Sequence, residues 1–252
     1  MGSGAIQVSE ERGVRYLHFG SHWVQGAMRM SRPYALELEY TREMMLPLLL
    51  RPGAGWPARA LLIGLGAGSL AKFLWRHRPG CAITVVETRE DVLTAAAQFF
   101  RLPDDPQRLA VELADGVAFV ATPGPRYDLI LVDGYDARGR VGALDTPTFY
   151  RHCRERLAEH GMLATNLLSR HRGIDASLAR LAAAFDRRAM ALAPCASGNV
   201  IALAACGAPV DLDARELSTR AAALRAESEL NLAPTVDRLA RRQKSYDTPA
   251  AL

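Results

Sequence analysis

The chain has 252 residues, 49% of them hydrophobic and 23% charged, and a net charge of +4. This length suits one large globular domain with a small appendage, and the hydrophobic share excludes a disordered chain. No apolar run reaches the roughly 18 residues of a membrane span, and we find no secretory signal at the start of the sequence. We therefore expect a cytoplasmic protein with no membrane partner.

The distribution of charged and sulfur-containing residues argues against two further classes of function. The Lys and Arg residues are spread along the chain and form no basic stripe interleaved with aromatics, so we expect no nucleic-acid partner. The cysteines form no C-x-x-C pair, and neither they nor the histidines show metal-ligand spacing. We expect buried thiols in a reducing compartment and no bound metal.

The N-terminal segment predicts short strands followed by a helix. Residues 5–30 carry aromatic and β-branched positions interrupted by Gly13 and Gly20, a pattern typical of hairpins. Residues 35–50 predict a helix with an apolar face, in which Pro47 either kinks the helix or starts a new turn. A small β region therefore precedes the main pattern of the chain.

The middle of the chain alternates apolar strands with helices. The segments, in chain order, are a strand, glycine turn and helix over 59–79, a strand over 82–87, a helix over 89–100, a strand and short helix over 109–121, a strand and loop over 127–139, a helix over 146–161 closed by Gly161, a strand over 162–168, a helix over 175–189 and an antiparallel strand pair over 189–206. Such alternation predicts a mostly parallel sheet covered on both faces. We expect a doubly wound, seven-stranded, Rossmann-like α/β fold.

This pattern divides the chain into three expected parts. Residues 1–34 form the small N-terminal β region, residues 35–211 a Rossmann-like nucleoside-binding catalytic domain, and residues 212–252 a C-terminal helical extension and tail. Parallel sheets bind ligands beyond the carboxyl ends of their strands, and three acids fall at such ends. These acids are Glu87, Asp115 and Asp133. Their shared position predicts a binding site at that edge.

A glycine-rich turn follows the first strand of the alternating pattern. Gly64, Gly66 and Gly68 let the backbone approach a ligand closely, and the helix behind them offers free N–H groups at its N-terminus. Glu87 ends the next strand, 23 residues after Gly64. An acid there typically accepts hydrogen bonds from both ribose hydroxyls. The combination favours an adenosine-type ligand over the alternative, a tight turn with an acid at a strand end by chance.

The third strand ends in Asp115, and Gly116 then opens a helix. A carboxylate at this place can accept a hydrogen bond from an adenine amino group, so we include both residues in the predicted cofactor site. The alternative is ordinary helix capping, because an Asp at the start of a helix commonly accepts a hydrogen bond from the first turn. Both interpretations stay open at this point.

Several segments occur in the order seen in one known family. They are "EYTREMM", "LLIGLGAGSL", "VVETRED", "ADGVAFV", "YDLILVDGYDARG", "FYRHCRERLAEHGMLATNL" and "SGNVIALAAC". Over residues 5 to about 207 the chain resembles the spermidine synthase family of polyamine aminopropyltransferases, which has the class I S-adenosylmethionine-dependent methyltransferase fold. The resemblance implies transfer of an aminopropyl group, without a metal, from decarboxylated S-adenosylmethionine to a small-molecule amine such as putrescine. It also suggests a homodimer.

The resemblance assigns roles to the acids at the strand ends. It implies that Glu87 holds the ribose of the donor and Asp115 its adenine amino group. It makes Asp133 the base that takes a proton from the attacking ammonium, and Asp136 a partner for the amine. The chemistry agrees, because an ammonium has no lone pair and must lose a proton before it attacks. For Asp136 the alternative is an Asx-type turn in a glycine-rich loop.

Three further residues are expected to line the substrate pocket. They are Tyr40, Gln25 and Tyr135. For the two aromatic residues, packing in the core is the alternative.

Two of the chain's departures from the family pattern bear directly on its substrates. Ala67 stands where the family's glycine loop usually carries an acid that binds the donor's terminal amine. The loop after Asp133 lacks the family's two prolines and carries Arg138 and Arg140, which would repel a diamine and suit an anionic group better. Two alternatives therefore stay open: a methyltransferase that uses S-adenosylmethionine itself, and a catalytically silent nucleoside-binding homologue.

Overall fold

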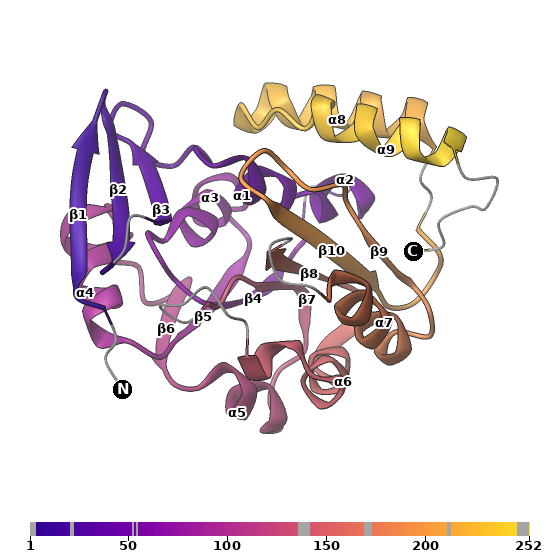
Figure 1. Cartoon of the computed structure of the whole chain (residues 1–252), viewed down its shortest axis with the longest axis horizontal. Helices are drawn as coiled ribbons and strands as arrows, with labels where there is room; N and C mark the ends of the chain where they lie inside the picture. The colour runs from indigo at the N-terminus through magenta and orange to yellow at the C-terminus, as the bar shows by residue number, and fades with distance from the viewer. Residues whose placement is uncertain are drawn as a thin grey trace.

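The computed structural model describes residues 4–20, 23–51, 53, 55–135, 142–168, 173–210, 213–245 and 252. These residues form a three-stranded sheet and a seven-stranded sheet. The small sheet stands at one end of the molecule, and the C-terminal helices run along another side (Figure 1).

The small sheet is an antiparallel meander at the N-terminus. It consists of β1 (Ile6–Glu11), β2 (Val14–Phe19) and β3 (Val24–Arg29). The turn between β1 and β2 contains Gly13 at a φ of +75°, a left-handed conformation that glycine adopts readily. The short strands predicted over residues 5–30 are therefore confirmed.

The large sheet has the strand order β6-β5-β4-β7-β8-β10-β9. Its strands are β4 (Arg59–Ile63), β5 (Ala82–Glu87), β6 (Leu109–Leu113), β7 (Tyr127–Val132), β8 (Leu157–Leu168), β9 (Ala189–Ala191) and β10 (Asn199–Ala205). All pairs from β6 through β8 are parallel, whereas β10 runs antiparallel to both β8 and β9. The predicted seven-stranded, mostly parallel sheet with a closing antiparallel pair is confirmed.

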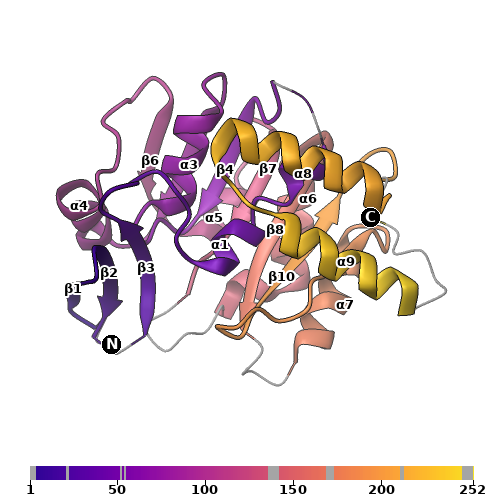
Figure 2. The ribbon, with the colours of Figure 1, turned by 90° about the horizontal axis from the view of Figure 1, so that it is seen from above.

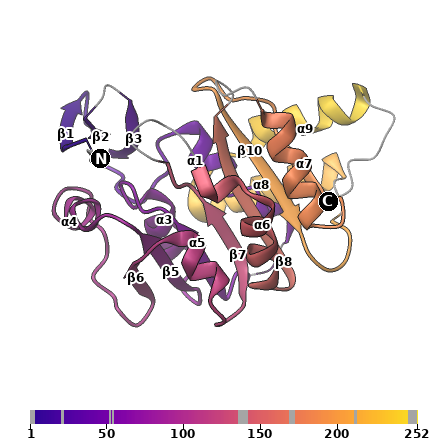
Figure 3. The same ribbon diagram turned by 60° about the horizontal axis from the view of Figure 1, so that its bottom comes forward.

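Helices cover both faces of the large sheet. They are α1 (Glu39–Glu43), α2 (Pro47–Leu50), α3 (Ser69–His77), α4 (Glu90–Phe99), α5 (Gly116–Ala121), the 3-10 helix η1 (Gly142–Asp145), α6 (Pro147–Glu155), α7 (Ile174–Ala184), α8 (Ala214–Ser228) and α9 (Ala233–Ser245). On β4, Leu62 joins the core formed with α1–α4, α8 and α9, whereas Leu61 joins the core formed with α5–α7. Figure 3 shows α5, α6 and α7 together on one face. Both faces of the strands are apolar because both are covered.

The single helix predicted over residues 35–50 is wrong, because the structure has two short helices there. α1 begins only after Leu38, which is extended. Between α1 and α2 the backbone forms tight turns with hydrogen bonds between residues three apart, such as the one from Leu46 N–H to the carbonyl of Glu43 (2.9 Å). Pro47 has no N–H to continue the helical ladder and is the first residue of α2. The expectation that Pro47 starts a new turn is confirmed.

The helix predicted over residues 146–161 is also too long. α6 ends at Glu155, and Gly161 lies inside β8 instead of closing a helix. The reason is sheet pairing: the N–H of Tyr127 on β7 donates to the carbonyl of Arg156 (2.8 Å), and Leu157 is the pairing partner of Tyr127. Tertiary pairing overrides the local helical pattern.

The C-terminal helices pack on the N-terminal helices, and α9 forms ion pairs with α1. α8 and α9 contact each other, and α8 packs on α2 (Figure 2). Arg238 of α9 pairs with Glu39 of α1 at 3.0 Å and also with Glu43. Glu43 is only 1% exposed, so Arg238 supplies the countercharge for a carboxylate that is almost fully out of water.

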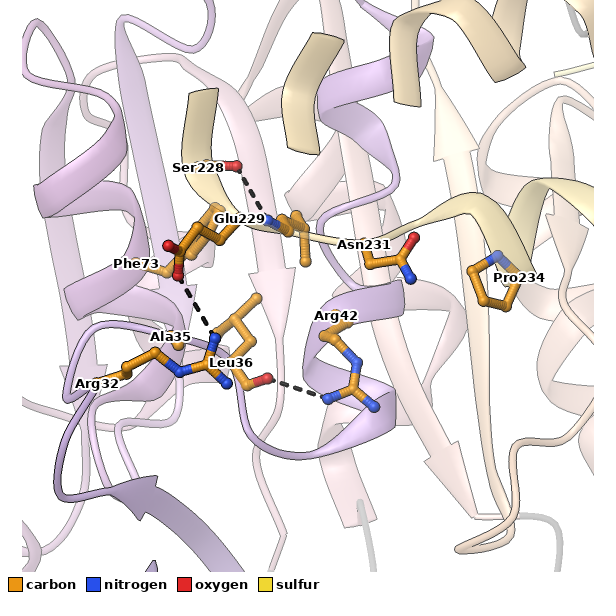
Figure 4. A pocket seen from close by; sticks show the side chains of 10 residues that line it. Arg32, Ala35, Leu36, Arg42, Phe73, Ser228, Glu229, Asn231 and Pro234 are labelled. Carbon is orange, nitrogen blue, oxygen red and sulfur yellow. Dashed lines mark hydrogen bonds and ion pairs between the residues drawn. The ribbon is translucent and has the colours of Figure 1, made fainter. Parts of the chain in front are cut away.

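A cavity of about 320 Å³ lies between the α8–α9 turn and the segment that precedes α1 (Figure 4). Its polar lining includes Arg32, which pairs with Glu229 at 3.5 Å, and Arg42, which donates to the carbonyl of Leu36 at 3.1 Å. Two positions along a helix are about 200° apart, so Arg42 and Tyr40 leave α1 on opposite sides. The cavity is therefore separate from the site at Tyr40 described below.

No helix in the described ranges is long and apolar enough to cross a membrane. Within the same ranges, no three His, Cys, Asp or Glu residues are grouped so that they could hold a metal ion.

Candidate active site

The carboxyl ends of β4, β7 and β8 bring together the glycine turn, Asp133 and Asn166. β7 pairs with β4 on one side and β8 on the other, and each of these residues lies at the carboxyl end of its strand. The N–H of Asp133 donates to the carbonyl of Ile63 (2.8 Å). A Cβ on Gly64 would lie 2.4 Å from the carbonyl oxygen of Asp133, so only glycine fits beside this backbone.

The glycine turn has the open backbone that the sequence predicts. Gly64, Gly66 and Gly68 have φ values of +98°, +52° and +68°, and α3 begins directly after them. The strand β3 presses on the turn, because a Cβ on Gly26 would lie 2.5 Å from the Cβ of Ala67. Ala67 is 2% exposed, so its methyl group is shielded from solvent beside β3.

Glu87 is held against the same turn. Its Oε2 accepts a hydrogen bond from the N–H of Leu65 (3.0 Å), and its Oε1 accepts from the N–H of Thr88 (2.8 Å) and of Arg89 (3.1 Å). The side chain is half-buried. A longer bond from Thr88 Oγ1 (3.4 Å) also reaches Oε1, so these contacts fix the orientation of the carboxylate. Oε2 accepts only from Leu65 among the described residues, so it keeps acceptor capacity for a ligand hydroxyl.

Asp115 caps α5. Its Oδ1 accepts a hydrogen bond from the N–H of Ala118 (2.9 Å), so the capping interpretation describes one of its two oxygens. The side chain is exposed, and the N–H of Ala114 donates to the carbonyl of Glu87 (2.9 Å), which joins the two acidic strand ends. Gly116 is buried against β4, where a Cβ would lie 2.5 Å from Cγ2 of Ile63.

Asp133 lies between a phenol and an amide. The hydroxyl of Tyr40 donates to its Oδ2 (3.2 Å), and Nδ2 of Asn166 donates to its Oδ1 (2.8 Å). Burial raises the pKa of Asp133, while these two hydrogen bonds act in the opposite direction. Burial and the neighbouring Asp133 also raise the pKa of Tyr40 well above its usual value, so this phenol stays protonated as a donor.

Two of the remaining predicted site residues, Tyr135 and Gln25, lie close by. The hydroxyl of Tyr135 donates to the backbone carbonyl of Asn166, so its ring is directed toward β8. The carbonyl oxygen of Gln25 would lie 3.3 Å from a Cβ on Gly66, so β3 brings Gln25 to the glycine turn. Asp136 falls outside the described residues, and so do the two arginines that follow it.

Sequence reasoning missed three residues that the structure brings to this edge. The only sequence feature that marks Asn166 is that it is the one amide within an apolar strand. The only one that marks Asn199 is its position directly after a Ser-Gly turn. Leu144 carried no signal, yet its methyl groups would lie 2.6 Å and 3.5 Å from Cβ atoms on Gly134 and Gly116. It forms an apolar surface beside the predicted adenine position.

Solved structures with a similar fold define the structural class of this protein. The structure is similar to human methyltransferase-like protein 13 in complex with SAH, with 28% identity, a TM-score of 0.67, and coverage of 76% of this chain and 93% of that one. It is also similar to a probable spermidine synthase from Corynebacterium glutamicum, with 20% identity, a TM-score of 0.72, and coverage of 89% and 88%. The second likeness concerns the fold alone. The chain has the methyltransferase-like α/β fold.

Sequence comparison narrows the class to a family. The spermine/spermidine synthase domain matches residues 39–208. The chain is 33% identical over 234 residues to the polyamine aminopropyltransferase of Chromobacterium violaceum, which covers 93% of this chain and 88% of the relative. The chain therefore belongs to the spermine/spermidine synthase family, and the predicted resemblance is confirmed.

Proposed function

We propose that this transferase moves an aminopropyl group from decarboxylated S-adenosylmethionine to a small amine such as putrescine, a step of polyamine biosynthesis. Family membership and the aminopropyltransferase of Chromobacterium violaceum support the reaction class. The observation that carries the proposal is a half-buried carboxylate, Asp133, which accepts hydrogen bonds from Tyr40 and Asn166 directly beside the glycine turn.

The proposed reaction forms a C–N bond and breaks a C–S bond. The lone pair of the amine attacks the propyl carbon on the sulfonium, and the C–S electron pair stays on sulfur, so neutral methylthioadenosine leaves. The amine is first an ammonium, and Asp133 accepts its proton. Because burial raises the pKa of Asp133, this carboxylate is a stronger base than an exposed aspartate.

The donor is assigned to the edge formed by β4, β5 and β6. We propose that its nucleoside lies over Gly64, Gly66 and Gly68, where the left-handed backbone leaves no Cβ in the way. Glu87 then accepts from the ribose. Asp115, with Gly116 behind it, accepts from the adenine amino group through the carboxylate oxygen that does not cap α5.

The acceptor is assigned to the other side of Asp133. We propose that Tyr40, Tyr135 and Gln25 line its pocket, and that Asp136 binds the amine. A cytoplasmic homodimer belongs to the same proposal, and sedimentation of the purified chain tests the dimer.

Ligand-induced thermal stabilisation tests the donor assignment. Methylthioadenosine and decarboxylated S-adenosylmethionine should both raise Tm, because a ligand that binds only the folded state stabilises it. Glu87→Gln should weaken this shift, and Glu90→Gln, an exposed change three residues further on, should not. The absence of a shift with either nucleoside would refute the proposed function.

A further inference from the structure

A chain of hydrogen-bonded polar side chains runs from Asp133 along the edge of the sheet to the start of β10. Asn166 on β8 and Asn199 on β10 are 2% and 7% exposed, and the two strands pair directly. β10 runs antiparallel to β8, so its first residue, Asn199, lies at the edge where β8 ends. Ser197 and Cys195 continue the line in the turn before β10.

Every contact in this line has the same direction. Ser197 Oγ donates to Asn199 Oδ1 (2.6 Å), Asn199 Nδ2 donates to Asn166 Oδ1 (2.9 Å), and Asn166 Nδ2 donates to Asp133 Oδ1 (2.8 Å). The Sγ of Cys195 lies 3.0 Å from Ser197 Oγ. Since the hydroxyl proton of Ser197 is used on Asn199, the thiol is the donor in this contact. All the donors therefore point toward the carboxylate.

We propose that Asn199 and Ser197 are positioning residues, which act through Asn166 to keep its NH₂ group directed at Asp133. The two ends of an amide have nearly the same shape but opposite hydrogen-bonding character. An unrestrained Asn166 could therefore turn and present its oxygen to the carboxylate. Asn199 prevents this because its own NH₂ group needs an acceptor there, and Ser197 fixes Asn199 in the same way.

The order of donors determines how Asp133 meets the amine. A carboxylate has about four acceptor sites, of which Asn166 and Tyr40 occupy one on each oxygen. Within the part of the chain that the structure describes, no other hydrogen bond to this carboxylate is seen, and we assign the remaining sites to the ammonium. The catalytic meaning of this arrangement rests on the proposed function, whereas the order of the hydrogen bonds does not.

The groups that face Asp133 supply donors and no positive charge in the described part of the chain. Tyr40 faces it from α1, Tyr135 from the segment after β7, and the thiol of Cys195 lies close to Tyr40. Burial raises the pKa of both phenols, so both stay neutral. Asp136 falls outside these residues. Loss of the amide donor should raise the pKa of Asp133, because a hydrogen bond to the charged form favours that form.

The experiment measures the ionisation of Asp133 directly and then the transfer rate. Carbon-13 NMR of protein labelled at aspartate carboxyls gives the pKa, and Asp133→Asn assigns the resonance. Asn199→Asp keeps the shape but replaces the donor with an acceptor, so Asn166 must turn its NH₂ group away. The added negative charge also raises the pKa of Asp133, and the uncharged change Ser197→Ala separates the two effects. The expected result is a rise in the pKa of Asp133 by about one pH unit. The acidic limb of the transfer-rate profile should move by the same amount, with the rate at its plateau little changed.

Two further variants keep the result interpretable. Val200→Ala changes the next residue of β10, whose side chain belongs to the core on the other face, so it should lower stability without moving the pKa of Asp133. Ser197→Ala lies in an exposed turn and tests the relay if Asn199→Asp does not fold; it should raise the pKa by a smaller amount.

An unchanged pKa of Asp133 in the folded variants would overturn the proposal, and so would an equal shift in Val200→Ala. If the wild-type protein shows no aminopropyl transfer, the proposed function fails, while the NMR titration still decides the relay.

Discussion

Asp133 can serve as a base because its neighbours are donors that leave it partly open. Tyr40 and Asn166 each bind one oxygen, and burial works against the charged form. These opposing influences keep the carboxylate oriented while raising its basicity. The backbone of Asp133 also lies against the glycine turn, which places the proposed base next to the proposed binding site of the aminopropyl donor.

Asp133→Asn removes the base and preserves the shape. Transfer should fall by about 100-fold or more, since a positioned base typically contributes a factor of about 10² to 10⁴. Binding of methylthioadenosine, measured by calorimetry, should be unchanged. Full activity in this variant would remove Asp133 from its assigned role.

The amino group of Lys72 is buried, and it gives a stability prediction. It is 1% exposed, its Nζ donates to the carbonyl of Phe100 (2.6 Å), and burial lowers its pKa to about 7. The unfolded lysine has a pKa of about 10.4, so between these values the unfolded chain binds a proton that the folded chain lacks. Stability should therefore rise with pH across this window, by up to about 1.4 kcal/mol per pH unit.

Lys72→Met should accordingly be more stable than the wild type near neutral pH, and its advantage should shrink as the pH approaches about 10. Urea unfolding at several pH values measures this. Arg76→Met, an exposed change on the same helix, should give no such trend. A pH-independent difference for Lys72→Met would contradict the assigned ionisation.

At the scale of elements, the site depends on how closely the turn after β4 approaches the end of β7. Gly64 and Gly13 both have positive φ, but only Gly64 is crowded: a Cβ there meets the carbonyl of Asp133, and a Cβ on Gly13 meets nothing within 4 Å. Substitution at Gly13 therefore reports the cost of backbone strain alone, and substitution at Gly64 reports strain plus the steric conflict.

Gly64→Ala should therefore destabilise the protein more than Gly13→Ala. The strain alone costs about 1–2 kcal/mol, and the displaced backbone adds to it at Gly64. Gly64→Ala should also lose nucleoside binding. Chemical unfolding and ligand-induced Tm shifts provide the measurements; equal losses of stability would show that the close approach is unimportant.

The strands and most helices were predictable from the sequence because apolar periodicity reports burial. The strands from β4 to β7 follow that pattern. The pattern failed over residues 146–161, where the pairing of Leu157 with Tyr127 extends a strand into a helix-like sequence. It also failed over residues 35–38, which lie before α1 and are not helical, whereas the break at Pro47 was expected from the sequence.

The candidate site was predictable in part for a similar reason. Acids at the ends of parallel strands are visible in sequence, so Glu87, Asp115 and Asp133 could be selected. Asn166 and Asn199 could not, because their roles depend on the antiparallel pairing of β8 with β10, which is not visible locally.

At the scale of the molecule, the C-terminal helices support α1 and thus Tyr40. Arg238 reaches from α9 to Glu39 and Glu43, which flank Tyr40 on α1. The same helix therefore presents its phenol to Asp133 and its carboxylates to the C-terminal pair.

Arg238→Met should leave the carboxylate of Glu43 buried without a countercharge. The free energy of unfolding should fall by about 2–4 kcal/mol, because removing one partner of a buried ion pair strands the other. Arg225→Met on the exposed face of α8 is the matched control and should change it by no more than about 0.5 kcal/mol. Equal effects in urea unfolding would mean that Arg238 does not support α1.

The most direct test of the account is to identify the reaction products by mass spectrometry. The purified chain, given decarboxylated S-adenosylmethionine and putrescine, should form spermidine and methylthioadenosine in equal amounts, and Asp133→Asn should form almost none. Methylated amine from S-adenosylmethionine, or no aminopropylated product despite bound donor, would contradict it.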